Sequence, residues 1–234
     1  ISSSGHSVIY ASGIVNVAGL TRDVATGDIF VTTYSEMGLI KKIDPHGQVT
    51  DVVGTTFNRP RGISLRQGTN ELFFVVGDPA VSEGASSIKM INLATGVVVE
   101  YAAGFNSLYD IHVPSSGPYI YATDIGKQFI MKINQHGIVY KFANHRKTYT
   151  TPSNTQASME SMAPYSLTRD DDAGVIYVTN HWSGFGSDSS SNYYNQVEDN
   201  VVKVTDNRFS TGYQRRRLTE RKIPQQEKYI RIKF

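Results

Sequence analysis

Short apolar segments of strand length recur along the chain and give the first indication of its fold. One such segment has a β-branched residue at each end and a lysine between them; its copies are Ile40–Ile43, Ile88–Ile91, Ile130–Ile133 and Val201–Val204. A second, rich in aromatic and β-branched residues, precedes each copy: Ile29–Thr32, Leu72–Val75, Ile120–Thr123 and Ile176–Thr179. Continuous apolar runs of this length are typical of buried strands.

Each pair of segments is flanked by two further strand signals. A short strand lies upstream, with an apolar residue at Leu20, Ile63, Ile111 or Leu167, and a glycine turn downstream opens another strand in three of the repeats. Four strands in roughly 40–50 residues is the size of one propeller blade. The pattern therefore predicts an all-β fold: a β-propeller of four-stranded antiparallel blades, with four complete repeats plus a partial blade.

The repeats divide the chain into three parts. Residues 1–18 are expected to form the outer strands of a partial blade, with strands three and four over 8–18, and residues 19–214 the four blades. Residues 215–234 carry eight basic and two acidic residues and form a basic tail or a closing strand. Two polar segments, 144–163 and 183–199, lengthen the repeat and are expected to be a linker and a loop.

The repeat resembles the NHL family and its six-bladed relatives over roughly residues 8–207. The motifs that carry the resemblance are Gly27–Thr32, Gly174–Thr179 and the turn Asp44–Gly47. The resemblance implies architecture, because this superfold hosts lectins, lyases, lactonases and protein-binding modules. Calcium-dependent lactonases of the superfold use Glu, Asn and Asp at the channel mouth, and no Glu occupies the inner strands predicted here. The NHL-type amidating lyase uses several His ligands and disulfides, whereas this chain has no cysteine.

Polar residues at the ends of the predicted inner strands are the candidates for a site. In a propeller the innermost strands surround a central channel, at whose mouth ligands usually bind. The residues that could converge there are Asp110, His112, Asp124, Asn180 and His181. Such a set can hold Ca²⁺ through oxygens or a transition metal through imidazole. The structural alternative is that Asp110 and Asp124 bind neighbouring backbone N–H groups and that His112 is an interior residue.

These observations favour a non-enzymatic NHL-like propeller that acts as a protein- or ligand-binding or assembly module. The absence of cysteine excludes disulfides, thiolate metal sites and a cysteine nucleophile. No phosphate-binding glycine loop, zinc-protease helix or serine-hydrolase elbow occurs. The alternatives are a metal-dependent, lactonase-like hydrolase or lyase at the channel mouth, and a carbohydrate-binding propeller.

The expected partner is a protein, or a second copy joined through the incomplete N-terminal blade, because an unpaired strand edge recruits another strand. No apolar run is long enough to span a membrane. Nucleic acid is not expected as a partner, since the body outside the tail is mildly acidic. We expect no cofactor, with Ca²⁺ at the central channel as the alternative. The sequence does not define the compartment, and an extracellular or secreted location is favoured.

Overall fold

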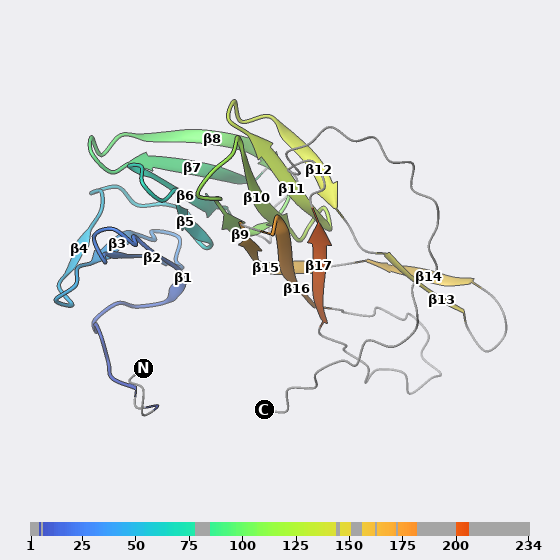
Figure 1. The fold of residues 1–234 in the computed structure, drawn as a ribbon, viewed down its shortest axis with the longest axis horizontal. Helices are drawn as coiled ribbons and strands as arrows, with labels where there is room; N and C mark the ends of the chain where they lie inside the picture. Colours follow the sequence, from blue (N-terminus) through green and yellow to red (C-terminus); the bar gives the residue numbers. More distant parts are fainter. Residues whose placement is uncertain are drawn as a thin grey trace.

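The computed structural model describes residues 5, 7–77, 85–143, 146–150, 156–161, 163–171, 173–181 and 200–205. These residues form antiparallel sheets that follow one another in an arc (Figure 1). The described part of the chain contains strands and turns and no helix, as the apolar pattern predicts. It accordingly has no helix of the length and apolarity needed to cross a bilayer.

Four sheets correspond to the four predicted repeats. The first blade contains β1 (Val17–Arg22), β2 (Ile29–Thr33), β3 (Ile40–Ile43) and β4 (Val49–Asp51). The second contains β5 (Ile63–Leu65), β6 (Glu71–Val76), β7 (Ser86–Asn92) and β8 (Val98–Phe105). The third contains β9 (Leu108–His112), β10 (Tyr119–Asp124), β11 (Phe129–Asn134) and β12 (Val139–Ala143). The fourth contains, within the described residues, β15 (Ala163–Asp170), β16 (Val175–His181) and β17 (Asn200–Thr205).

The first strand of each sheet lies innermost, and the inner strands of successive sheets contact one another: β1 with β5, β5 with β9, and β9 with β15. This is the arrangement of a β-propeller, in which blades stand side by side around a common centre. The fold class predicted from the repeat is therefore confirmed.

The register of the inner strand pairs is the same in all four blades. The matching pairs are Leu20 opposite Val31, Ile63 opposite Phe74, Ile111 opposite Ala122 and Leu167 opposite Val178. Within the three residues before the first member of these pairs, the inner strands of the first, third and fourth blades have a bulge. A constant register places the same repeat position on the same face of every blade, because side chains alternate along a strand.

The core lies between blades. We call the face of a blade that packs against the following blade its forward face, and the opposite one its rear face. Phe30 and Ile40 on the first forward face pack with Ile63 and Leu72 on the second rear face. Equivalent clusters join the second blade to the third, through Phe73 and Ile111 among others, and the third to the fourth. Blade contacts of this kind bury apolar area on both faces of each inner sheet.

A threonine hydroxyl links two pairs of blades. In the first blade Thr32 Oγ1 accepts a hydrogen bond from the bulge N–H of Gly19 at 2.9 Å and donates to the Arg61 carbonyl at 2.5 Å. In the third blade Thr123 Oγ1 accepts from Asp110 N–H at 3.0 Å and donates to the Tyr165 carbonyl at 2.6 Å. The hydroxyl thus satisfies a bulge donor that the sheet leaves unpaired, and fixes the next inner strand.

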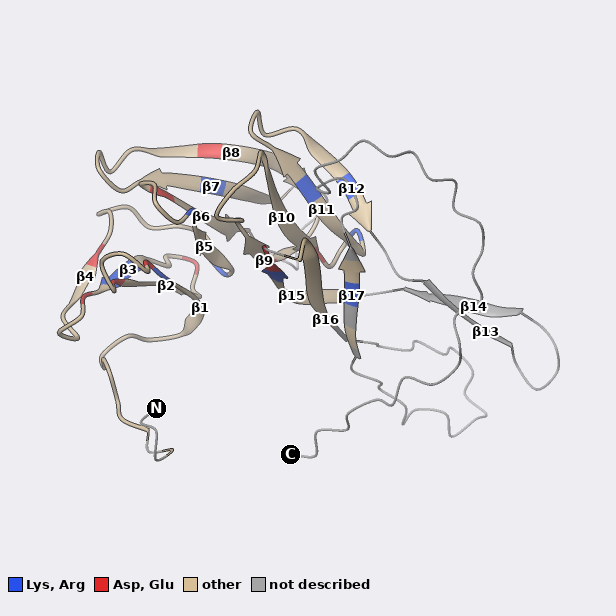
Figure 2. Cartoon of the chain, viewed as in Figure 1, with Lys and Arg blue, Asp and Glu red and all other residues tan. Residues whose placement is uncertain are grey.

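Basic and acidic residues lie on neighbouring outer strands of two blades (Figure 2), where they form ion pairs. Lys41 Nζ lies 2.6 Å from Asp51 Oδ1, and Lys89 Nζ lies 3.6 Å from Glu100 Oε2 at the equivalent cross-strand position. Exposed pairs of this kind contribute little stability, about 0–1 kcal/mol.

Two expectations about the connecting segments need correction. Residues 7–15, which the structure describes, form no strand, so the two strands expected over 8–18 are not present; Val17–Arg22 is instead the inner strand of the first blade. A strand needs a partner for its backbone groups, and no described strand pairs with residues 7–15. Part of the expected polar linker 144–163 forms the hairpin β13 (Arg146–Thr150) and β14 (Gln156–Ser161). The loop 183–199 and the tail 215–234 lie outside the described residues.

Candidate binding site at the inner strands

The inner strands of all four blades border one cavity of about 960 Å³. Its lining comes from β1 and the residues before it, the start of β5, the middle of β9 and the start of β15. The described lining residues are Asn16, Val17, Ala18, Gly19, Leu20, Tyr34, Arg61, Gly62, Ile63, Tyr109, Asp110 and Ser166. A concave site at the convergence of the blades is the expected place for a ligand in this architecture.

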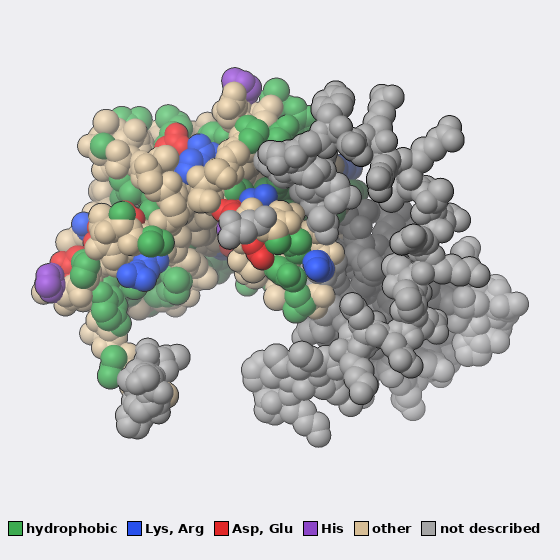
Figure 3. Space-filling model, in the orientation of Figure 1, with side chains coloured by type: hydrophobic (Ala, Val, Ile, Leu, Met, Phe, Trp, Pro, Cys, Tyr) green, Lys and Arg blue, Asp and Glu red, His purple; other side chains and the backbone are tan. Residues whose placement is uncertain are grey.

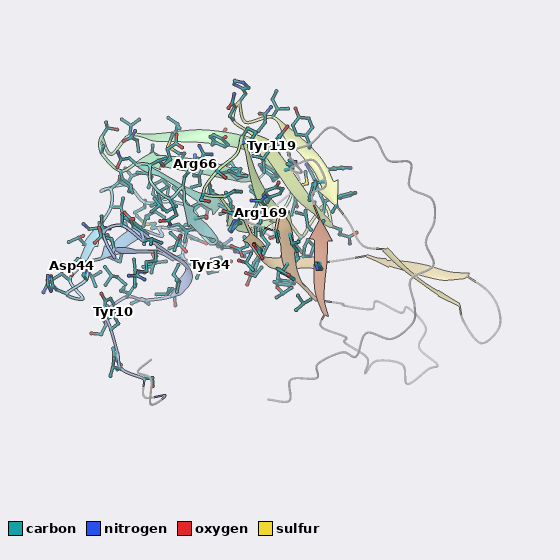
Figure 4. All side chains as sticks on the ribbon, in the orientation of Figure 1. Tyr10, Tyr34, Asp44, Arg66, Tyr119 and Arg169 are labelled. Atoms are coloured by element: carbon teal, nitrogen blue, oxygen red, sulfur yellow. The ribbon has the colours of Figure 1, made fainter. Side chains whose placement is uncertain are left out.

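Arg61 is the cationic residue of this cavity. Its guanidinium carbon lies 4.8 Å from the ring centroid of Tyr34 and 5.0 Å from that of Tyr109, and Nη2 donates to the Tyr34 hydroxyl at 2.9 Å. Tyr34, at the end of the first blade's second strand, is labelled in Figure 4 on the inner side of that blade. Contacts with two rings hold a guanidinium in place and leave donors for an anion.

Tyr109 is itself positioned by the fourth blade. Its ring meets the ring of Tyr165 edge to face, with centroids 4.7 Å apart and planes at 66°. Tyr34, Arg61, Tyr109 and Tyr165 come from the first, second, third and fourth blades, so all four blades act together to orient one guanidinium. Within the described residues, no carboxylate forms an ion pair with Arg61.

Asp110 lines the same cavity and is already engaged. Its carboxylate accepts hydrogen bonds from the Ser166 hydroxyl at 2.5 Å, from Leu167 N–H at 3.0 Å and from its neighbour Ile111 N–H at 2.9 Å. Burial raises the pKa of Asp110, and these hydrogen bonds oppose that rise. The opposite side is closed by Gly62, where a Cβ would lie 2.5 Å from an Asp110 carboxylate oxygen. Asp110 thus joins the third blade to the fourth.

Asp124 has a structural role at the end of β10. It is fully buried, and its carboxylate accepts hydrogen bonds at 3.0 Å from the backbone N–H groups of Asn106, Ser107 and Lys127. Asp110 and Asp124 therefore both bind backbone N–H groups, as the structural alternative in the sequence analysis expected.

His112 lies at the opposite end of the inner strands from Asp124. Across β9 and β10 it is paired with Tyr121, whereas Asp124 is paired with Leu108. Its Nε2 lies 3.8 Å from an oxygen of Asp171, and burial lowers the pKa of the imidazole. For Asp171 burial acts in the opposite direction and raises the pKa. The hydrogen bonds from Ser115 and the positive charge of Arg169 outweigh this effect, so the pKa of Asp171 is lowered overall.

Five residues were predicted to converge, and the structure places them at three levels. Asp110 lines the cavity, His112 lies at one end of the inner strands, and Asp124 is buried in a turn at the other. Asn180 and His181 belong to the last residues of β16, opposite the start of β15, and their side chains are not described. Among the described residues there is no group of three His, Asp or Glu placed to hold a metal ion.

The residues that the sequence analysis missed are Arg61, Tyr34 and Tyr109. Arg61 and Tyr109 both stand two positions before the apolar residue that recurs in each inner strand, Ile63 or Ile111. That position has no apolar signature, so the repeat pattern alone gave no reason to select it. In the third blade a bulge lies at this part of the inner strand.

No protein-family model and no curated protein matches the chain by sequence. Solved structures resemble it in fold. A chain of a nidogen/laminin complex superposes with a TM-score of 0.50 and 14% identity, covering 72% of this chain and 76% of that one. A luciferin-regenerating enzyme gives a TM-score of 0.50 and 11% identity over 80% of this chain and 60% of that one.

A gluconolactonase from Xanthomonas campestris gives a TM-score of 0.54 and 12% identity over 75% of this chain and 58% of its own. This chain therefore spans about three quarters of the first relative and about 60% of the other two. Identities this low show the fold alone. The chain has a β-propeller architecture that is shared with protein-binding and enzymatic relatives.

Proposed function

We propose that this chain is a non-enzymatic, NHL-like propeller that binds an acidic group of a protein partner or small ligand in the inner-strand cavity. The observation that carries the proposal is the Arg61 guanidinium, held between Tyr34 and Tyr109 with no described carboxylate paired to it. A carboxylate matches the planar donor fork of arginine and can accept two parallel hydrogen bonds from it.

The electrostatics of the cavity support an anion over a cation. The one acidic residue among the described lining residues, Asp110, already accepts three hydrogen bonds, so its oxygens are occupied. The tyrosine rings add apolar contact area beside the charge, which favours a group whose acid is attached to a carbon skeleton. A glutamate or aspartate side chain of a partner protein has this chemistry.

The proposal is tested by NMR titration with glutarate, a small dicarboxylate, while the side-chain Nε–Hε signal of Arg61 is followed. We expect that signal to shift saturably, and Arg61→Gln to abolish the shift while the fold is retained. Arg59→Gln is the matched control, because Arg59 lies two residues away and pairs with Glu36 at 3.0 Å outside the cavity lining. A titration that moves only the arginine signals of residues 215–234 rejects the proposal.

The enzymatic alternative uses the same cavity. A lactonase-like, metal-dependent reaction requires oxygen ligands at the channel, and Asp110, the acidic residue of the described lining, would have to give up some of its hydrogen bonds to act as one. Exchanging Asp110 for Asn, and measuring Ca²⁺ content and melting with and without chelator, separates the two functions. A chelator effect on the native protein that the Asp110→Asn variant loses supports the metal site.

A further inference from the structure

The two ends of the arc expose positions that every internal blade contact buries. On the forward faces, Phe30, Phe73 and Tyr121 are at most 3% exposed, whereas the equivalent Tyr177 of the fourth blade is 37% exposed. Ile40, Ile88 and Ile130 are 0% exposed, whereas the equivalent Val201 is 69% exposed. On the rear faces, Ile63, Ile111 and Leu167 are at most 7% exposed, whereas Leu20 of the first blade is 68% exposed.

The segment before the first blade matches the outermost strand of a blade. Residues 5–14 read Gly-His-Ser-Val-Ile-Tyr-Ala-Ser-Gly-Ile, and residues 96–105, which include β8, read Gly-Val-Val-Val-Glu-Tyr-Ala-Ala-Gly-Phe. The glycines that open the two segments both have positive φ, 78° at Gly5 and 71° at Gly96. The glycines near their ends do so too, 78° at Gly13 and 85° at Gly104. The match continues without a gap to Leu20 and Ile111.

This segment also contacts the first blade as β8 contacts the third. The Tyr10 hydroxyl donates to the Asp44 carbonyl at 3.1 Å, and the equivalent Tyr101 hydroxyl donates to the Asn134 carbonyl at 2.9 Å. Figure 4 shows Tyr10 beside the turn that contains Asp44. The expected partial blade is thereby corrected: residues 7–14 have the sequence and contacts of a fourth strand alone, displaced from the register expected over 8–18.

This segment pairs with no sheet among the described residues. Val8 and Ile9 are 82% and 88% exposed on a segment that projects from the body (Figure 3). The fourth blade, in contrast, has three described strands, and its last one, β17, pairs in the described chain only with β16. An unpaired strand edge and an unpaired strand are complementary, because backbone N–H and C=O groups need partners.

We propose that residues 7–14 of one copy of this chain add to β17 of a second copy as the outermost strand of its fourth blade, so that copies join head to tail. The register follows from β7 and β8, where Met90 lies opposite Val99 and Ile91 opposite Val98. It places Val8 of one copy opposite Lys203 of the other, and Ser7 opposite Val204. After this strand the chain continues into the first blade of its own copy. Leu20 of that blade then covers Tyr177 and Val201 of the other copy.

The proposed contact between copies would repeat the interface that joins neighbouring blades, which occurs three times within the chain. In each of those contacts an inner-strand carbonyl, of Arg61, Tyr109 or Tyr165, accepts a hydrogen bond from the preceding blade. The equivalent acceptor of the first blade is Ala18, and the equivalent donor of the fourth is Thr179, whose side chain is exposed. The forward face of the fourth blade of one copy thus meets the rear face of the first blade of another copy. Because the two surfaces differ, the contact is heterologous and forms a ring or an open chain.

The test is disulfide trapping, which the absence of native cysteine makes specific. Val8→Cys and Lys203→Cys are made in separate copies, mixed and oxidised; opposed residues of antiparallel strands lie about 4.5–5.5 Å apart, within disulfide range. We expect a covalent dimer. Ser12→Cys replaces Val8→Cys in the control mixture, because it lies four residues, about 13 Å, along the strand. The control should give at least tenfold less dimer.

Sedimentation velocity over a range of concentrations gives an independent reading. We expect association of the unmodified chain, its loss in Val8→Lys with Ile9→Lys, and its retention in Val97→Lys, which changes an exposed residue of the second blade. A chain carrying both Val8→Cys and Lys203→Cys that forms only a cross-linked monomer would overturn the proposal in favour of closure within one chain. A chain that is monomeric at every concentration overturns it as well.

Discussion

At the residue scale, the threonine that ends the motif of the second strand is the clearest link between sequence and assembly. Thr32 and Thr123 each accept a hydrogen bond from a bulge in their own blade and donate one to the next. The second blade has Val75 at this position, and there the Gly62 N–H donates directly to the Tyr109 carbonyl at 3.1 Å. A hydroxyl is needed only where the backbone does not bridge the blades itself.

Thr123→Val is expected to lower the free energy of unfolding by about 1–3 kcal/mol, because it leaves the Tyr165 carbonyl and the Asp110 N–H without their partner. Valine has nearly the same shape, so packing changes little. The matched control is Thr179→Val, whose hydroxyl bonds Ser166 in its own blade at an exposed site, and it should cost less. Guanidinium unfolding midpoints compare them, and equal losses would contradict the interblade role.

At the element scale, stability resides in contacts between sheets. The three core clusters each join the forward face of one blade to the rear face of the next. The ladder within a blade sets the register, and the facing sheet decides how much apolar surface leaves water. A residue at one repeat position can therefore be a core residue in one blade and a surface residue in another.

Tyr121 and Tyr177 allow this to be measured with the same substitution. Tyr121→Ala, at a fully buried position, is expected to cost about 3–5 kcal/mol. Tyr177→Ala, at the equivalent position with 37% exposure, is expected to cost less than about 1.5 kcal/mol in dilute protein. Thermal and denaturant unfolding report both values. Similar losses would show that the fourth forward face is covered in solution.

At the scale of the whole molecule, the four blades form an arc whose inner members are supported from both sides. The second and third blades have a neighbour on each face, whereas the first blade's rear face and the fourth blade's forward face carry exposed apolar residues. Repeat architectures gain stability from such nearest-neighbour contacts. The arc is therefore expected to be least stable at its ends.

Hydrogen exchange in dilute protein should show this gradient. Amides of β10 and β11 are expected to exchange at least about tenfold more slowly than the paired amides of β16 and β17, because opening an end blade breaks one interface and opening an inner blade breaks two. The difference should narrow as protein concentration rises, if β17 gains a strand from a second copy. Uniform protection across the blades at low concentration would contradict the gradient.

The sequence by itself determined the repeat, its four-stranded unit and the positions that are equivalent between the repeats. Phe30, Phe73, Tyr121 and Tyr177 could be aligned because a strand buried on both faces leaves a continuous apolar run that is readable without coordinates. The tertiary structure decided which copies of a position are covered, since burial depends on a neighbouring blade. It also decided the cavity: Arg61, Tyr34 and Tyr109 come from three blades, and the repeat position shared by Arg61 and Tyr109 has no apolar signature. Asp124 looked like a channel residue in the sequence, yet folding turns its carboxylate onto three backbone N–H groups, because a buried turn must satisfy those donors.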